Sequence, residues 1–305
     1  MVKITSELLN KLELKLDFKI FSYESLGDGN HNINFVLKTS KGNFVLRIYA
    51  NSQFNNSLKE FKILKKLDGF HAPKVYFFDD SKNVLEFDYL IQEFIEGSVL
   101  KNFSESDFKE VVRILKDINK IKDVNELKNS KESIGFWTKN NLLKNSELLG
   151  FEFNSEMKKI YSKVIVKFKE SDSLISKYEP IHLIHNDLIP SNIIRKPNGD
   201  LVFIDWEFAN FNYFFSDLAI FIVGNLLSKK DELLVLKEYG FGLSSDEKKL
   251  ILREKLKASL VNIAWLIERI SSFKQGKQLI HKSDSVEKYQ NSLEKNLNYI
   301  NSLLD

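Results

Sequence analysis

The sequence contains no cysteine among its 305 residues, and this absence excludes disulfide bonds, thiolate metal sites and a cysteine nucleophile together. A strong excess of charge is lacking as well, because 45 lysine and arginine residues are balanced by 42 aspartate and glutamate residues. The net charge of +3 is too small for a chain of this size to indicate a dedicated nucleic-acid surface. We therefore expect no nucleic-acid partner.

Long apolar runs are also missing. The first 20 residues, MVKITSELLNKLELKLDFKI, carry charges throughout and lack the uninterrupted apolar stretch and small-residue cleavage site of a signal peptide. No run elsewhere approaches the ~20 apolar residues that a membrane span needs. We expect a cytoplasmic protein without a membrane span, in line with the absence of cysteine.

The first third of the chain has the alternating pattern of β-strands. Residues 21–50 have apolar residues on both sides of a turn rich in glycine and asparagine. Residues 57–67 place apolar side chains at mostly helical spacing, and two more strand-like runs follow at 74–80 and 84–95. We expect a small β-rich N-lobe over residues 1–97.

From about residue 101 the pattern becomes helical, with one interruption. The stretches IHLIH (181–185) and DLVFIDW (200–206) are typical of short strands, and the turn at 197–200 predicts that they form one hairpin. We expect a helical C-lobe over residues 98–305. The fold class is therefore predicted to be α+β with two lobes, a size that 305 residues allow.

Two motifs in the C-lobe match the chemistry of phosphoryl transfer. HNDLIPSN (185–192) places Asp187 five residues before Asn192, as in kinase catalytic loops where the aspartate accepts the hydroxyl proton and the asparagine holds Mg²⁺. Asp205 in IDWE follows a hydrophobic strand, where kinases place a second metal ligand. On the two arms of one hairpin these side chains would come together, as a two-metal ATP site requires. We predict ATP and Mg²⁺ as cofactors, and a structural role for His185.

The N-lobe supplies candidates for binding the phosphates of ATP. Gly27, Gly29 and Asn30 fall between two predicted strands, where backbone N–H groups could lie over the phosphates. Arg47 stands where a kinase has its phosphate-contacting lysine, and Glu60 on the next helix is placed to pair with it. The remaining candidates for the nucleotide site are Gln92 and Phe94.

These motifs resemble the aminoglycoside phosphotransferase and choline/ethanolamine kinase superfamily. The resemblance runs from Gly27 to about Tyr299, and it implies a bilobal protein-kinase-like fold and transfer of the γ-phosphoryl group of Mg·ATP to a small-molecule hydroxyl group. Arg47 in VLRIY, Asn186 in His-Asn-Asp and the sequence IDWE are similar to the choline/ethanolamine branch. The resemblance therefore implies choline or ethanolamine as the acceptor.

A choline site must satisfy a quaternary ammonium that donates no N–H hydrogen bond, so it uses aromatic faces and nearby carboxylates. Trp265 and Glu268 lie three residues apart on a predicted helix and would share a face. The family has a comparable tryptophan-bearing helix and a later tyrosine, which Tyr289 matches. The candidates for the substrate site are Trp206, Glu207, Tyr213, Trp265 and Glu268.

Other functions stay open at this point. The loop SLGDGNHNINF (25–35) is similar to that of methylthioribose kinases, so the acceptor could be methylthioribose, a sugar or an aminoglycoside. A nucleotide-binding pseudokinase usually loses one equivalent of Asp187, Asn192 or Asp205, and all three are present. A protein kinase is disfavoured because no Asp-Phe-Gly to Ala-Pro-Glu segment is visible. A small-molecule substrate is the expected partner, and a homodimer is left open.

Overall fold

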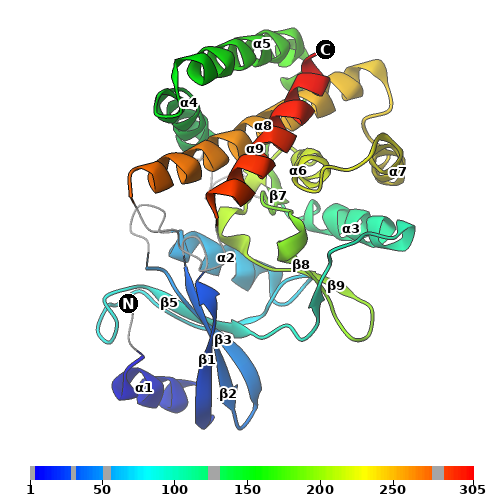
Figure 1. The fold of residues 1–305 in the computed structure, drawn as a ribbon. Helices are drawn as coiled ribbons and strands as arrows, with labels where there is room; N and C mark the ends of the chain where they lie inside the picture. The colour runs from blue at the N-terminus through cyan, green and yellow to red at the C-terminus, as the bar shows by residue number, and fades with distance from the viewer. Residues whose placement is uncertain (1–3, 29–31, 51–55, 123–130, 277–284) are drawn as a thin grey trace. The chain divides into compact units, whose positions relative to one another are not determined.

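The computed structural model describes residues 4–28, 32–50, 56–122, 131–276 and 285–305 (Figure 1). The chain divides into two compact units, and the first of them is discontinuous. The first unit comprises residues 1–100 and 191–209, and the second comprises 101–190 and 210–305.

An antiparallel five-stranded sheet forms the centre of the first unit, with the strand order β1-β2-β3-β5-β4 (Figure 1). The strand predicted at 84–95 is shorter in the structure, because strand pairing begins only at Tyr89. The strands of the sheet are β1 (Ile20–Asp28), β2 (Ile33–Thr39), β3 (Gly42–Ile48), β4 (Val75–Asp79) and β5 (Tyr89–Glu93).

The alternation of β3 decides which face of this sheet is apolar. Phe44, Leu46 and Ile48 belong to one buried cluster, and helix α1 (Ser6–Leu16) covers that cluster with Leu8 and Leu12. Successive side chains of a strand point to opposite faces, so Arg47 lies on the other face. One face of the sheet thus packs into the apolar core, and the other carries the polar side chain of Arg47.

Helix α2 (Ser57–Leu67) and a second, three-stranded sheet complete the first unit. Gly97 stands just before this sheet with φ of 154°, and a Cβ atom there would lie 2.2 Å from the carbonyl oxygen of Arg195. Only glycine allows the two backbones to approach so closely. The members of the sheet, followed by a short 3₁₀ turn, are β6 (Ser98–Val99), β8 (Ile193–Arg195), β9 (Leu201–Phe203) and η4 (Trp206–Phe208).

The predicted hairpin exists, but its first strand is not the predicted stretch 181–185. β9 pairs with β8, which follows the 3₁₀ turn η3 (Pro190–Asn192), and not with the stretch 181–185. That stretch contains β7 (His182–Ile184), which pairs in the second unit with β10 (Asn210–Asn212). The η3 turn redirects the chain after the catalytic loop, so a new strand begins at residue 193.

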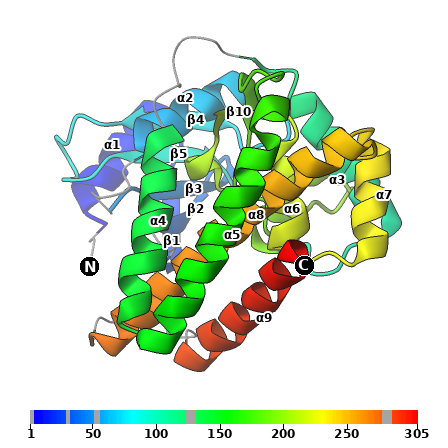
Figure 2. The ribbon, with the colours of Figure 1, turned by 90° about the horizontal axis from the view of Figure 1, so that it is seen from above.

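The second unit is helical, and its longest helix, α8, packs against α4, α5, α6 and α9. Figure 2 shows α4 and α5 side by side with α8 crossing them. Serine caps begin several of these helices; Ser244, for example, forms a capping box with Glu247 at the start of α8. The helices are α3 (Glu105–Ile118), α4 (Lys131–Glu147), α5 (Phe151–Ile175), α6 (Ser216–Gly224), α7 (Lys229–Tyr239), α8 (Ser245–Lys274) and α9 (Val286–Leu304).

The predicted fold class is confirmed: an antiparallel β-rich N-terminal region precedes a helical C-terminal region. Among the described residues, every helix is too short or too polar to cross a membrane. The assignment of a nucleotide-binding lobe to residues 1–97 and a catalytic lobe to 98–305 stays a prediction.

Candidate active site

Arg47 is the centre of a buried charge cluster in the first unit. Its side chain is only 5% exposed, and its Nη2 atom lies 2.5 Å from Oδ1 of Asp205. Its Nε atom lies 3.2 Å from Oε2 of Glu60, whose residue is 1% exposed. Arg47 therefore contacts both Glu60, the predicted helix carboxylate, and Asp205, the predicted metal ligand.

Local structure explains how the three side chains meet. Arg47 lies on the face of β3 opposite the apolar cluster, and Glu60 lies in the first turn of α2, where a negative charge is favoured by the helix dipole. Asp205 follows β9 directly with φ of 66° and ψ of 64°, a left-handed conformation that aspartate tolerates better than most residues. Such outliers are concentrated at functional sites.

Asn192 lies at the same end of the β8–β9 hairpin as Asp205. Its carbonyl oxygen accepts a hydrogen bond of 2.9 Å from the N–H of Ile204, one residue before Asp205. The first pair of the ladder, Ile193 opposite Phe203, continues from this bond. The hairpin thus brings together the two predicted metal ligands of the first unit.

Glu207 joins the same cluster through the segment that precedes β2. Its Oε2 atom accepts a hydrogen bond of 2.7 Å from Nδ2 of Asn32 and lies 3.7 Å from Nη2 of Arg47. The pKa of Glu207 is raised to about 8, mainly by burial and also by the negative charges of Asp205 and Glu60, against the opposing effects of Arg47 and Asn32. With this pKa Glu207 is mostly neutral at pH 7, so the guanidinium of Arg47 is paired mainly with Glu60 and Asp205.

This cluster fits a magnesium ion. Asn192 and Asp205 offer amide and carboxylate oxygens, the ligand type that Mg²⁺ prefers, and Mg²⁺ is commonly held by one or two protein ligands together with water and phosphates. In keeping with so small a donor set, the described residues contain no group of three or more His, Cys, Asp or Glu side chains arranged for a metal.

The predicted catalytic loop, at His185–Asp187 in the second unit, is held by backbone hydrogen bonds and not by ion pairs. The backbone N–H groups of His185 and Asn186 donate to the two carboxylate oxygens of Asp217 at 2.7 and 2.8 Å. Asn186 has φ of 67°, and the N–H of Asp187 donates to Nδ1 of His185 at 3.3 Å. His185 is fully buried, which agrees with its predicted structural role.

Asp217 is a positioning residue to which the sequence analysis gave no role. It is fully buried at the start of α6, and burial raises its pKa to about 6 although the two backbone hydrogen bonds oppose the shift. A signal was present in the sequence, because an aspartate twelve residues after Asp205 opens an apolar helix. A buried aspartate at such a helix start is a candidate acceptor for backbone donors.

The other predicted nucleotide residues are only partly described. Gly27 belongs to the backbone of β1, whereas Gly29 and Asn30 lie outside the described residues. Gln92 is buried on β5 opposite Val45, so it shares the sheet face of Arg47. Phe94, just past that strand, is half-buried.

The five predicted substrate residues are divided between the units, with Trp206 and Glu207 in the first. Trp206 is fully buried, and its indole N–H donates to the carbonyl oxygen of Phe203 at 2.8 Å. Tyr213 in the second unit is half-buried, with its ring centroid 5.5 Å from that of Phe215. These contacts give Trp206 a packing role.

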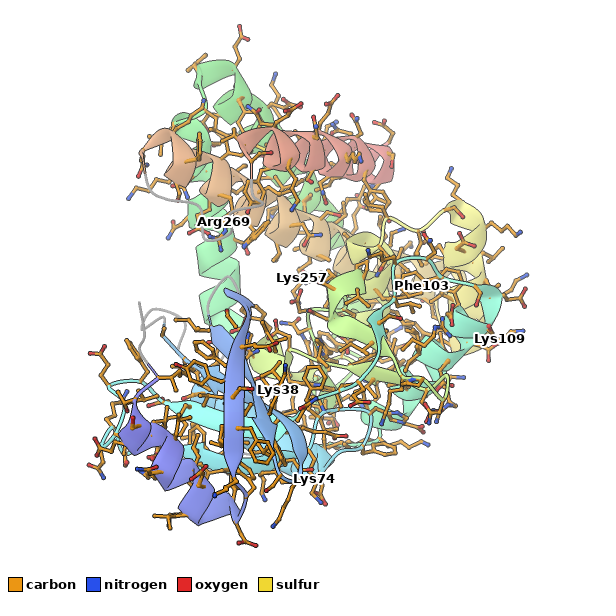
Figure 3. The ribbon with its side chains drawn as sticks, turned by 60° about the horizontal axis from the view of Figure 1, so that its bottom comes forward. Lys38, Lys74, Phe103, Lys109, Lys257 and Arg269 are labelled. Carbon is orange, nitrogen blue, oxygen red and sulfur yellow. The ribbon has the colours of Figure 1, made fainter. Side chains whose placement is uncertain are left out.

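Trp265 and Glu268 are both half-buried on α8, as the predicted spacing requires. The Trp265 ring meets Tyr289 edge-on at 5.7 Å between centroids, so the tryptophan and the later tyrosine are in contact. Arg269, labelled in Figure 3, places its guanidinium carbon 5.1 Å from the centroid of the Trp265 ring. A cation thus already lies over this aromatic ring.

Comparison with known proteins decides the family. The sequence model of the phosphotransferase enzyme family matches residues 22–250, which is most of the chain. The chain belongs to this family. The predicted family is thereby confirmed, and small-molecule phosphotransfer is the activity class of this phosphotransferase. Among curated proteins, none matches the sequence.

Solved structures of related fold include kinases with several acceptors. The choline kinase LicA from Streptococcus pneumoniae has a TM-score of 0.68 and 21% identity, over 97% of this chain and 98% of that chain. An ethanolamine kinase from Plasmodium vivax has a TM-score of 0.58 and 21% identity, over 98% and 86%. The spectinomycin phosphotransferase APH(9)-Ia has a TM-score of 0.63 and 14% identity, over 100% and 96%. At these identities the likeness of the phosphotransferase to them is one of fold.

Proposed function

We propose that this phosphotransferase moves the γ-phosphoryl group of ATP onto the hydroxyl group of a small amino alcohol, choline or ethanolamine. The observation that carries the proposal is the buried cluster in which Arg47 contacts both Glu60 and Asp205. Catalysis of phosphoryl transfer rests on positioning and on neutralising phosphate charge, and such a cluster holds the required cation and carboxylate in place. ATP as the donor fits a cytoplasmic enzyme.

Each of the predicted catalytic and metal-binding residues has a defined part in the proposed reaction. Asp187 orients the acceptor hydroxyl group and takes its proton as the oxygen–phosphorus bond forms and the bond from the γ-phosphorus to ADP breaks. Asn192 and Asp205 hold Mg²⁺, which when bound neutralises the phosphate oxygens and fixes their orientation. Arg47, kept in place by Glu60, contacts the phosphates as a planar donor.

The remaining nucleotide contacts are assigned to the N-lobe, over residues 1–97. Backbone N–H groups near Gly27, Gly29 and Asn30 would face the phosphates. Gln92 and Phe94 would lie along the nucleotide, and the position of Gln92 on the sheet face of Arg47 supports this assignment.

The choice of acceptor rests on the choline-like motifs and on α8. Trp265 is a half-buried ring in edge-on contact with the buried ring of Tyr289, and Glu268 offers a carboxylate one helical turn from Trp265. Aromatic rings and carboxylates are the groups that recognise a quaternary ammonium. Tyr213 and Glu207 complete the proposed set, and the fold likeness to a choline kinase and an ethanolamine kinase supports the same class.

An ATP-consumption screen with purified protein and Mg²⁺ tests the proposal. The acceptors are choline, ethanolamine, methylthioribose, simple sugars and an aminoglycoside, and the Asp187→Asn variant is the control for background hydrolysis. We expect turnover with choline or ethanolamine only, lost in the control. Turnover with another acceptor would retain phosphotransfer and replace the acceptor class. Nucleotide binding without turnover on any acceptor, unchanged in Asp187→Asn, would mean a pseudokinase.

A further inference from the structure

Tyr49 donates a hydrogen bond to the carboxylate that forms an ion pair with Arg47. Its phenol oxygen donates to Oε2 of Glu60 at 2.8 Å, and the two residues are 2% and 1% exposed. The Nε atom of Arg47 lies 3.2 Å from the same oxygen. The phenol and the guanidinium therefore converge on one carboxylate oxygen from two residues of the same chain segment.

The ring of Tyr49 is fixed as well as its hydroxyl group. The guanidinium carbon of Arg47 lies 5.6 Å from the ring centroid, and the backbone N–H of Tyr49 donates to the carbonyl oxygen of Asp88 at 2.9 Å. Burial and the charge of Glu60 raise the pKa of Tyr49 well above its usual value. The phenol therefore remains a proton donor at every pH at which the protein would be assayed.

Arg47 is shared between Glu60 and the proposed metal ligand. Nη2 lies 2.5 Å from Asp205 and 3.7 Å from Glu207, while Nε serves Glu60. The charged and titratable groups that act on Glu60 are Arg47, Asp205, Tyr49 and the half-buried Lys59 of α2. Glu60 and Asp205 compete for the guanidinium of Arg47. A change that weakens the ion pair with Glu60 therefore strengthens the ion pair with Asp205.

We propose that Tyr49 is a positioning residue that keeps the Glu60 carboxylate on Arg47, and thereby limits how tightly Arg47 holds Asp205 away from Mg²⁺. This inference rests on the proposed function, because it assumes that Asp205 binds Mg²⁺ together with ATP. Without the phenol, the buried carboxylate loses the hydrogen bond that fixes it and keeps only its ion pair with Arg47; hydrogen bonds to charged groups are among the strongest in proteins. Arg47 then pairs more closely with Asp205, and Mg²⁺ has to compete for it.

The chain contains a matched control in the same sheet. The phenol of Tyr89, which is 1% exposed, donates to Oδ2 of Asp79 at 2.9 Å. That carboxylate is paired with Lys11 and belongs to the α1 side of the sheet, where the apolar cluster lies. Tyr89→Phe therefore removes the same chemical group from the same kind of pair, away from Arg47.

The test measures how the affinity for a non-hydrolysable ATP analogue depends on Mg²⁺, by titration calorimetry of the full chain. Tyr49→Phe should raise the half-saturating Mg²⁺ concentration roughly tenfold, as expected for one charge-assisted hydrogen bond. Tyr89→Phe should leave that concentration unchanged. The thermal midpoint of unfolding should fall by a similar amount in Tyr89→Phe and in Tyr49→Phe. Equal Mg²⁺ dependence of the two variants would overturn the inference.

A double-mutant cycle with Glu60→Gln tests the route of the effect. If Tyr49 acts through Glu60, Tyr49→Phe should add little to the Mg²⁺ requirement in the Glu60→Gln background. A full additional tenfold rise in that background would exclude the route. Should Tyr49→Phe fail to fold, Glu60→Asp tests the same point, because the shorter carboxylate cannot meet both the phenol and the guanidinium; an unchanged Mg²⁺ requirement would overturn the inference. Wild-type protein that binds no nucleotide at any Mg²⁺ concentration would instead refute the proposed function and the inference with it.

Discussion

The two units hold their functional aspartates in different ways. Asp205 in the first unit is held by the side chain of Arg47, which also serves Glu60 and Glu207. The loop of Asp187 in the second unit is held by backbone N–H groups that bind the buried carboxylate of Asp217. Ion pairs between side chains can be exchanged for a metal or a phosphate, whereas backbone hydrogen bonds to a buried carboxylate fix a loop. The comparison suggests an adjustable half and a rigid half of the proposed site.

Removal of Asp205 tests the adjustable half most severely. Asp205→Ala should lower turnover about a thousandfold or more, because a proposed metal ligand is lost while Glu60 and Glu207 still compensate Arg47. The free energy of unfolding should fall by only about 1 kcal/mol, since the carboxylate is partly exposed. Steady-state kinetics and chemical denaturation measure the two effects. Retained turnover would contradict the assignment of Asp205.

Removal of Arg47 should instead break the fold of the same cluster. Arg47→Met leaves the buried Glu60 without its ion-pair partner, with only the half-buried Lys59 as a nearby cation, and losing one partner of a buried ion pair costs about 3–5 kcal/mol. Urea denaturation at pH 7 measures this loss. A smaller loss at pH 7 than at pH 9 is expected, because the pKa of Glu207 is raised to about 8, so this carboxyl group becomes neutral as the pH falls through that range. A loss that does not depend on pH would mean that this carboxyl group does not titrate in that range.

Asp217→Asn sharpens the contrast from the side of the rigid half. Because the folded pKa of Asp217 is raised from 3.8 to about 6, its contribution to stability is present below about pH 4 and is lost as pH rises through 6. The wild type should therefore lose about 3 kcal/mol of unfolding free energy between pH 4 and 7 through this residue. Denaturation curves across this range should show that part of the slope missing in the variant. Parallel slopes would contradict the burial-driven shift.

The smallest expected effect distinguishes the two predicted substrate tryptophans. Trp265→Leu should raise the acceptor KM about tenfold and leave the ATP KM unchanged, because an aromatic face over a cation is worth about 1–2 kcal/mol. Trp206→Leu should lower stability by about 2 kcal/mol through lost packing and its bond to Phe203. Acceptor kinetics and thermal unfolding of both variants decide the matter. The reverse pattern would place the acceptor at Trp206.

Much of the first unit could be predicted because its patterns are local. The alternation of FVLRIY placed Arg47 opposite the core, and helical spacing placed Glu60 on α2. The arms of the hairpin were misassigned because two short strands of three residues compete for β9, and only the η3 turn decides between them. Short strands carry too little pattern to set their own partners.

The contacts that were missed join residues far apart in the chain. Asn32 and Glu207 are 175 residues apart in the chain. Asp217 lies 31 residues from Asn186, whose backbone N–H donates a hydrogen bond to it. No spacing rule connects such positions, because they are brought together by tertiary packing. The full burial of Trp206 has the same cause, since its environment is built by the fold and not by its neighbours in sequence.

The discontinuity of the first unit has a consequence for synthesis of the protein. Residues 191–209 belong to it, so Arg47 and Glu60 leave the ribosome long before Asp205 and Glu207. At about 5–20 residues per second, the stretch between Glu60 and Asp205 takes roughly 7–30 s to make. During that interval Arg47 can pair with Glu60 but not with Asp205 or Glu207. Completion of the charge cluster is therefore a late event, and it couples maturation of the first unit to translation of helices α3 to α5 of the second.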